Sequence, residues 1–267
     1  MIIKSLVKHN VSKGKYIEHY IKKGYNSLPS YFSKPLEIDT LFVFIAGCGH
    51  SGTTLLAAKL SNHSAILGIG RETGILSPGR NSITAIKAVL REWNYFSQIH
   101  GHTCILEKTP KHIYAYQQVQ SVLPNNKFII MLRNPLDTIA SLFKRFGDLE
   151  FCIDRWIYDN SEALALQKNS NVIYIKYEDL TDNPEDTLIK ALEFLGYEYE
   201  ENVLGSEETI YNKSPQKRNM KLREEQVSRP IRPNMGGWKK VFDVDQAKYI
   251  LSRVENISRK LNYKDSL

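Results

Sequence analysis

Residues 41–54 read LFVFIAGCGHSGTT and carry the strongest structural signal in the chain. The first six are apolar and rich in aromatic and β-branched types, as in a strand that is buried on both faces. Glycines end this strand, and leucines at helical spacing follow in residues 55–60. A strand that turns through a glycine-rich loop into a helix is typical of a site that binds phosphate at the helix N-terminus. A plain strand-to-helix turn is the alternative.

Strands and helices alternate through the rest of the chain. Further strands are expected at 65–69, 104–106, 127–132 and 171–175, and helices at 82–96, 113–122, 135–146, 184–195 and 244–261. This alternation predicts an α/β fold with a central parallel sheet of about four to five strands, a P-loop-like turn and helices on both faces. We expect one domain over residues 1–267, comprising a lead-in at 1–38, a nucleotide-binding core at 41–200, a basic lid loop at 205–240 and a last helix at 243–262.

The composition is that of an ordinary folded chain, with 267 residues of which 42% are hydrophobic and 24% charged. No apolar run approaches the roughly 20 residues of a membrane helix, and no secretory signal is apparent, so we expect a cytoplasmic protein without a transmembrane segment. The three cysteines show no CxxC spacing, which favours free thiols. The net charge of +7 suits an anionic ligand but falls short of the basic face of a nucleic-acid binder.

Two features distinguish the glycine-rich loop from that of a nucleoside triphosphatase. Thr53 stands where such a loop has the lysine that reaches the β and γ phosphates. The strand at 127–132 ends in Arg133, whereas a Mg²⁺-binding strand would end in a carboxylate. Arg133 and Ser141 can bind one anion together. The alternative for Arg133, when it is considered without Ser141, is a surface arginine at a helix end. The pattern predicts a nucleotide site without a metal.

These motifs resemble those of sulfotransferases that use 3′-phosphoadenosine 5′-phosphosulfate (PAPS). The resemblance rests on four segments in the family's order, which are Gly49–Thr54, Met131–Pro135 with Ser141, Tyr177–Leu180 and Gly236–Lys239. It implies that the 5′-phosphosulfate is bound by Gly49, His50, Ser51, Gly52, Thr53 and Thr54. It implies that the 3′-phosphate is bound by Arg133 and Ser141. It also implies that the purine side and the lid are formed by Tyr177, Arg232, Gly237, Trp238 and Lys239.

Two shorter elements resemble the family's transfer chemistry. Gly70–Thr73 resembles the Gly-Glu-Glu-Thr stretch of protein-tyrosine sulfotransferases, which implies that Glu72 is the general base. An exposed glutamate in a first helical turn is the alternative. Glu107–Pro110 resembles the Lys-Thr-Pro element of glycan sulfotransferases, which implies that Lys108 neutralises charge on the transferring group.

The sequence departs from the family at His50, because the family usually has Lys or Arg before Ser-Gly-Thr-Thr. A histidine can donate a proton to the leaving oxygen, so His50 is a candidate catalytic acid. A neutral loop histidine bonded to backbone is the alternative. The other histidines show no pairing at metal-ligand spacing, and we expect no metal site.

The function predicted from the resemblance is in-line transfer of a sulfuryl group from PAPS to an acceptor hydroxyl, leaving adenosine 3′,5′-bisphosphate (PAP). We expect a carbohydrate acceptor ahead of a tyrosine or a small alcohol, and no nucleic-acid partner. Pocket walls are expected in loops at 77–93 and 146–159. The alternatives are a P-loop nucleotide kinase and a non-catalytic nucleotide-binding member of the family.

Overall fold

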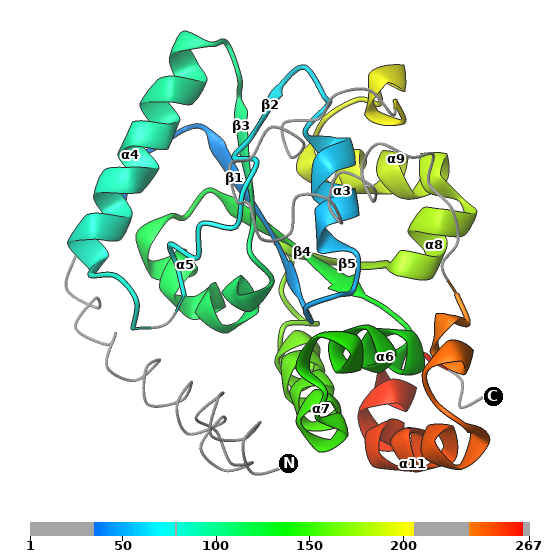
Figure 1. The fold of residues 1–267 in the computed structure, drawn as a ribbon. Coiled ribbons are helices and arrows are strands. Elements are labelled where there is room, and N and C mark those ends of the chain that lie inside the picture. The colour runs from blue at the N-terminus through cyan, green and yellow to red at the C-terminus, as the bar shows by residue number, and fades with distance from the viewer. Residues whose placement is uncertain (1–34, 78, 206–234, 264–267) are drawn as a thin grey trace.

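The computed structural model describes residues 35–77, 79–205 and 235–263. Five parallel strands form one sheet, and helices cover both of its faces (Figure 1). The strands are β1 (Leu41–Gly47), β2 (Ile66–Gly68), β3 (Cys104–Lys108), β4 (Asn126–Leu132) and β5 (Val172–Lys176). The predicted α/β class and the five predicted strands are confirmed.

The strand order is β2-β3-β1-β4-β5, which places β1 in the middle of the sheet. Strands β3 and β2 lie on one side of β1, and β4 and β5, which come later in the chain, lie on the other side. Open α/β sheets bind ligands beyond the carboxyl ends of the strands at the point where the strand order reverses. That point lies at the end of β1, where the glycine-rich loop begins.

The apolar run of β1 is buried throughout, as its composition predicts. Alternate side chains face opposite layers, so that Phe44 packs on one side and Ile45 on the other. The strand ends at Gly47, whose φ is +136°, and a β-carbon there would lie 2.4 Å from the carbonyl oxygen of Met131. Only glycine allows the chain to leave the sheet so close to β4.

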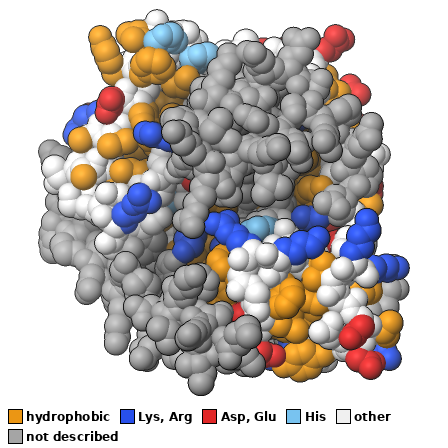
Figure 2. Space-filling model, in the orientation of Figure 1, with side chains coloured by type: hydrophobic (Ala, Val, Ile, Leu, Met, Phe, Trp, Pro, Cys, Tyr) orange, Lys and Arg blue, Asp and Glu red, His pale blue; other side chains and the backbone are white. Residues whose placement is uncertain are grey.

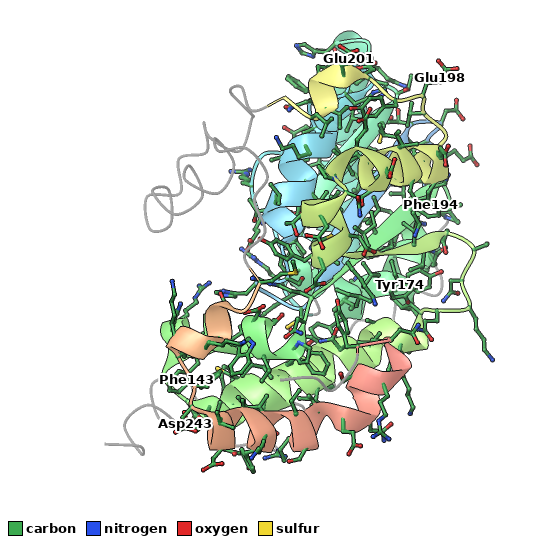
Figure 3. All side chains as sticks on the ribbon, turned by 90° about the vertical axis from the view of Figure 1, so that its right-hand side faces the viewer. Phe143, Tyr174, Phe194, Glu198, Glu201 and Asp243 are labelled. Carbon is green, nitrogen blue, oxygen red and sulfur yellow. The ribbon has the colours of Figure 1, made fainter. Side chains whose placement is uncertain are left out.

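The helices form two layers on the sheet. One layer contains α3 (Thr53–Leu60), α8 (Tyr177–Asp182) and α9 (Pro184–Leu195). The other contains α4 (Ile83–Ile99), the 3₁₀ helix η2 (Pro110–Ala115), α5 (Tyr116–Val122), α6 (Pro135–Phe146), α7 (Leu149–Ala165) and α11 (Val244–Lys260). Short 3₁₀ helices occupy Glu201–Val203 (η3) and Gly237–Lys240 (η5). Phe143 of α6 and Asp243 at the start of α11 lie in the same part of the molecule (Figure 3).

Helix α6 begins and ends where the sequence predicts. The Asn134 side chain accepts hydrogen bonds from the backbone N–H groups of Leu136 and Asp137, and Pro135 occupies the first turn. Helices α9 and α11 also match the predicted ranges within one residue. The predicted helix at 113–122 is a 3₁₀ segment followed by α5.

The prediction of a pocket-wall loop at 146–159 is wrong, because most of this range is helical. Gly147 ends α6 with a φ of 70°, and the Asp148 side chain caps α7 by accepting from the N–H of Phe151 at 3.0 Å. Helix α7 buries polar side chains such as Asp159 beside its apolar ones. This mixture hides the helical stripe in the sequence. The other predicted wall, 77–93, contains the first part of α4.

Some predictions fall on residues that the structure does not describe. Most of the lead-in (1–38) and of the lid (205–240) lies there, and so does Arg232. All three cysteines are described and are free, buried thiols, as predicted. Within the described ranges, no helix combines the length and the apolar character that a membrane crossing requires.

Candidate active site

Each of the five strands leads to a predicted site residue at its carboxyl end. Parallel strands bring these ends to one edge of the sheet. The glycine-rich loop follows β1, Glu72 lies beyond β2, and Lys108 ends β3. Arg133 follows β4, and Tyr177 follows β5. The predicted residues therefore come from separate parts of the chain to one edge.

The glycine-rich loop, residues 47–54, is held by its own contacts and lies against Tyr177, the first residue of α8. The Ser51 hydroxyl donates to the carbonyl of Cys48 at 2.6 Å, and Ser51 is buried. Gly52 is the N-cap of α3 with a φ of +94°, and a β-carbon there would lie 2.5 Å from the Tyr177 ring. Helix α3 begins at Thr53, so its first backbone N–H groups belong to Thr53 and Thr54. The first turn of the helix contains no acidic residue. Such a turn presents backbone donors to an anion.

His50 joins this loop to α6. Its Nδ1 lies 2.7 Å from the Ser141 hydroxyl, and its carbonyl accepts a hydrogen bond from Nη1 of Arg133 at 3.1 Å. Burial, together with the positive charges of Arg155, Arg145 and Arg133, lowers the pKa of His50 from 6.5 to about 4. The imidazole is therefore neutral near neutral pH. A role as catalytic acid, which stays a prediction, requires a bound anion to raise this pKa.

The low pKa of His50 predicts a pH dependence of stability. Between about pH 6.5 and 4 the unfolded chain binds a proton at His50 that the folded protein does not, so folding free energy is lost as the pH falls through this window. His50→Asn removes the titration, and asparagine tolerates the left-handed backbone (φ 72°) at this position. Urea unfolding should show that wild type loses on the order of 2–3 kcal/mol more than the variant between the two pH values. An equal loss of unfolding free energy in wild type and in His50→Asn would contradict a neutral His50.

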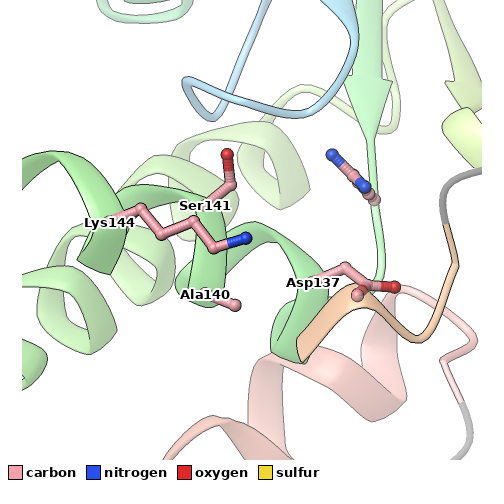
Figure 4. Close-up of a pocket in the computed structure, with 6 residues that line it drawn as sticks. Asp137, Ala140, Ser141 and Lys144 are labelled. Carbon is pink, nitrogen blue, oxygen red and sulfur yellow. The ribbon is translucent and has the colours of Figure 1, made fainter. Parts of the chain in front are cut away.

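A pocket of about 70 Å³ opens at Ser141, the hydrogen-bond partner of His50 (Figure 4). Its lining residues are Arg133, Asp137, Ala140, Ser141, Lys144 and Gly237. Figure 4 shows Ser141 and Lys144 on the same side of α6. The Arg133 guanidinium lies over the Tyr177 ring, with its carbon 4.2 Å from the ring centre. Two cationic side chains and a hydroxyl around a small space suit an anion such as a phosphate.

Lys and Arg side chains also gather around a histidine in the middle of the face shown in Figure 2.

Asp137 brings the C-terminal Gly-Gly-Trp segment to this pocket. Its two carboxylate oxygens accept the backbone N–H groups of Gly236 at 2.9 Å and of Trp238 at 3.0 Å. Trp238 is buried in the core, and the Lys239 ammonium lies 5.6 Å from its ring centre. The segment therefore reaches the pocket through Gly237. The roles predicted for Trp238 and Lys239 at the purine stay predictions.

Lys108 and Glu72 form an ion pair, with Nζ and Oε1 2.6 Å apart. The Lys108 side chain is 1% exposed, whereas that of Glu72 is 37% exposed, so the carboxylate faces solvent at the edge of the sheet. The negative charge of Glu72 opposes the lowering of the His50 pKa, which places Glu72 within electrostatic reach of the loop. Of the three predicted catalytic residues, Lys108 and Glu72 are therefore in contact, and Glu72 acts on His50 through its charge.

Glu107 fixes the segment that carries Glu72. Its Oε1 accepts hydrogen bonds from the Thr73 N–H at 3.0 Å, the Thr73 hydroxyl at 2.8 Å and the Thr109 hydroxyl at 2.7 Å. Its Oε2 lies 2.8 Å from Nδ1 of His112. Burial raises the pKa of Glu107, but His112 and these hydrogen bonds outweigh it and lower the pKa overall. The ionised carboxylate ties Thr73, and with it Glu72, to the end of β3.

Sequence reasoning missed four residues of this edge, namely Glu107, Asp137, Lys144 and Arg155. Helical spacing from Ser141 could have found Asp137 and Lys144, which lie four residues before it and three after it. A carboxylate inside an apolar strand was the available signal for Glu107. No sequence signal marks Arg155, because the sequence predicts a loop where α7 lies.

Residues 80–201 match the family model described as the sulfotransferase family. Protein-tyrosine sulfotransferase A of Caenorhabditis elegans is 26% identical over 227 residues, which cover 71% of this chain and 58% of the relative. Protein-tyrosine sulfotransferase 2 of Gallus gallus is 24% identical, with coverages of 63% and 54%. The chain therefore spans little more than half the length of these curated relatives.

Solved structures share the fold. The sulfotransferase domain from the Synechococcus PCC 7002 olefin synthase has a TM-score of 0.66 at 17% identity and covers 87% of this chain and 98% of its own. Mouse sulfotransferase SULT7A1, complexed with PAP, has a TM-score of 0.56 at 17% identity, with coverages of 87% and 89%. In sequence and in fold, the chain is therefore similar to sulfotransferases.

Proposed function

We propose that this protein transfers a sulfuryl group from PAPS to an acceptor hydroxyl. One observation supports this most strongly. The glycine-rich loop and the pocket lined by Arg133 and Ser141 are two separate places suited to an anion, and the hydrogen bond between His50 and Ser141 joins them. A donor with phosphate at both the 3′ and the 5′ position can use both sites, whereas a simple 5′-nucleotide can use only one.

The donor is proposed to bind with its 5′ end at the backbone of the loop and its 3′-phosphate in the pocket. The loop residues in this role are Gly49, His50, Ser51, Gly52, Thr53 and Thr54. Arg133 and Ser141 bind the 3′-phosphate, with Lys144 adding a charge. PAP in the mouse structure, which shares this fold, supports the choice of nucleotide.

Transfer is proposed as a single in-line displacement. Glu72 takes the proton of the acceptor hydroxyl while its oxygen forms a bond to sulfur, and the bond from sulfur to the 5′-phosphate oxygen breaks to release PAP. Lys108 lies 2.6 Å from Glu72 and stabilises negative charge at the transferring group. Arg133 stands where a Mg²⁺ ligand would end β4, so the proposal assigns no step to a metal.

The acceptor is proposed as a carbohydrate hydroxyl, in line with the Lys-Thr-Pro element at Lys108. A tyrosine hydroxyl is the second candidate, because several of the similar relatives are named protein-tyrosine sulfotransferases. A kinase is less well supported, since the loop has Thr53 in place of the phosphate-binding lysine. A non-catalytic binding protein would not need the Lys108–Glu72 pair.

Calorimetry with PAP and 5′-AMP tests the donor assignment. Wild type should bind PAP more tightly than 5′-AMP, because only PAP carries the 3′-phosphate that Arg133 contacts. Arg133→Ala should weaken PAP binding by about ten- to a hundredfold through loss of charge-assisted hydrogen bonds and leave 5′-AMP nearly unchanged. Arg91→Ala, which removes an exposed arginine from α4 that does not line the pocket, should change neither. Equal affinities of wild type for both nucleotides would rule out the proposed 3′-phosphate site.

A further inference from the structure

The geometry points to Arg155 of α7 as the cation that binds the anionic 5′ end of the nucleotide at the glycine-rich loop. This inference rests on the proposed function and adds to it a residue outside the loop. Residues 47–54 contain neither lysine nor arginine, so the loop itself supplies only backbone and hydroxyl donors. A phosphosulfate or phosphate group carries negative charge that such donors balance only in part.

Arg155 lies against the loop at Gly49. A β-carbon built on Gly49 would lie 2.8 Å from Nη2 of Arg155 and 3.6 Å from Cζ. The guanidinium therefore occupies the space that a side chain at position 49 would fill. The absence of that side chain lets the cation approach the loop backbone.

The positive charge of Arg155 shifts the pKa of both neighbours of Gly49, namely Cys48 and His50. It contributes to the low pKa of His50, and at Cys48 it opposes the rise in pKa that burial and Asp159 cause. His50 is itself neutral near neutral pH, so it does not replace the missing loop cation. An anion at the loop would meet the charge of Arg155 at short range.

The rest of the Arg155 side chain is held in place. Its Nε donates to Oδ2 of Asp159 at 3.4 Å, and Cζ lies 5.5 Å from the ring centre of Phe146. Asp159 is buried and also accepts a hydrogen bond from the Tyr114 hydroxyl. Asp159 engages the Nε edge, and Nη2 is the atom nearest to Gly49. A guanidinium fixed in this way is preorganised for an oxyanion.

Calorimetry with PAP and adenosine 3′-monophosphate isolates this contact, because the two ligands differ only in the 5′-phosphate. In Arg155→Met the affinity for PAP should fall by about ten- to a hundredfold, while that for the 3′-monophosphate should change less than about threefold. The matched comparison is Arg145→Met, which removes another arginine beside the same Phe146 ring and should reduce the preference for PAP less than Arg155→Met does, because no contact of Arg145 with Gly49 is present among the residues that the structure describes. Arg155→Lys keeps the positive charge beside Asp159 and replaces the Met variant if that variant does not fold. Its preference for PAP over adenosine 3′-monophosphate should lie between those of wild type and Arg155→Met.

A double-mutant cycle with Gly49→Ala provides the second measurement. Gly49 has no left-handed backbone angle, so alanine is allowed there, and its methyl group should displace the guanidinium. The loss of PAP affinity from Gly49→Ala should therefore be large in wild type and small in Arg155→Met. An unchanged PAP preference in Arg155→Met, or an equal effect of alanine in both backgrounds, would overturn the assignment. Failure of the proposed function would appear differently, as wild type that does not prefer PAP to 5′-AMP.

Discussion

Glu72→Gln is expected to lower kcat by about 10² to 10⁴ while PAP affinity stays near the wild-type value. Glutamine keeps the shape of the side chain and can still hydrogen bond, but it cannot accept the acceptor's proton. The carboxylate is 37% exposed beside the buried Lys108, so it is open to an acceptor. Single-turnover kinetics with PAPS, combined with PAP calorimetry, separate the chemical step from binding.

The matched control for Glu72→Gln is Arg71→Gln, which changes the neighbouring exposed residue in the same segment. It should leave both kcat and PAP affinity close to wild type. If Glu72 serves only as the ion-pair partner of the buried Lys108, Glu72→Gln lowers the stability of the fold but the rate survives. A fully active Glu72→Gln enzyme would remove Glu72 from the mechanism.

Lys108→Met is expected to lower kcat by about 10² to 10³, because a preorganised charge is lost where negative charge develops in the transition state. Methionine is similar in length and apolar, so the buried end of β3 should stay packed. PAP should still bind, since Lys108 does not line the Arg133 pocket. Thermal unfolding of the variant shows whether the fold is kept.

Two results with Lys108→Met would contradict this role. An unchanged kcat would show that the ion pair is structural. A loss of PAP affinity as large as the loss of kcat would place Lys108 in ground-state binding of the nucleotide instead of in the transfer step.

The fold could largely be predicted because its signals are local. The apolar run of β1 has the composition of a strand covered on both faces, and it is covered on both faces. Asn134 and Pro135 mark the start of α6 by capping chemistry that needs no tertiary contact. Helix α7 lacked such a signal, since Asp159 and Asn160 are buried among its apolar residues. Their burial depends on partners elsewhere in the chain, which periodicity does not reveal.

The candidate site could be predicted only where motifs follow strands. His50, Arg133 and Ser141 were found in this way, and the structure brings them within hydrogen-bond contact. Asp137 and Glu107 act through backbone groups distant in sequence, at Gly236 and Thr73 respectively. Contacts of this kind become visible only when the chain is folded. The neutral state of His50 likewise follows from burial and from arginines of three other segments.

Transfer of radiolabel from PAPS is the measurement that tests the proposed activity most directly. The wild-type protein is incubated with donor labelled in the sulfuryl group and with separate pools of glycans, tyrosine-containing peptides and small alcohols, with Glu72→Gln as the inactive control. The account predicts that one hydroxyl pool gains label, that PAP is released in equal amount and that excess EDTA does not change the rate. PAPS that binds without labelling any pool, or ATP and Mg²⁺ that support phosphate transfer instead, would contradict it.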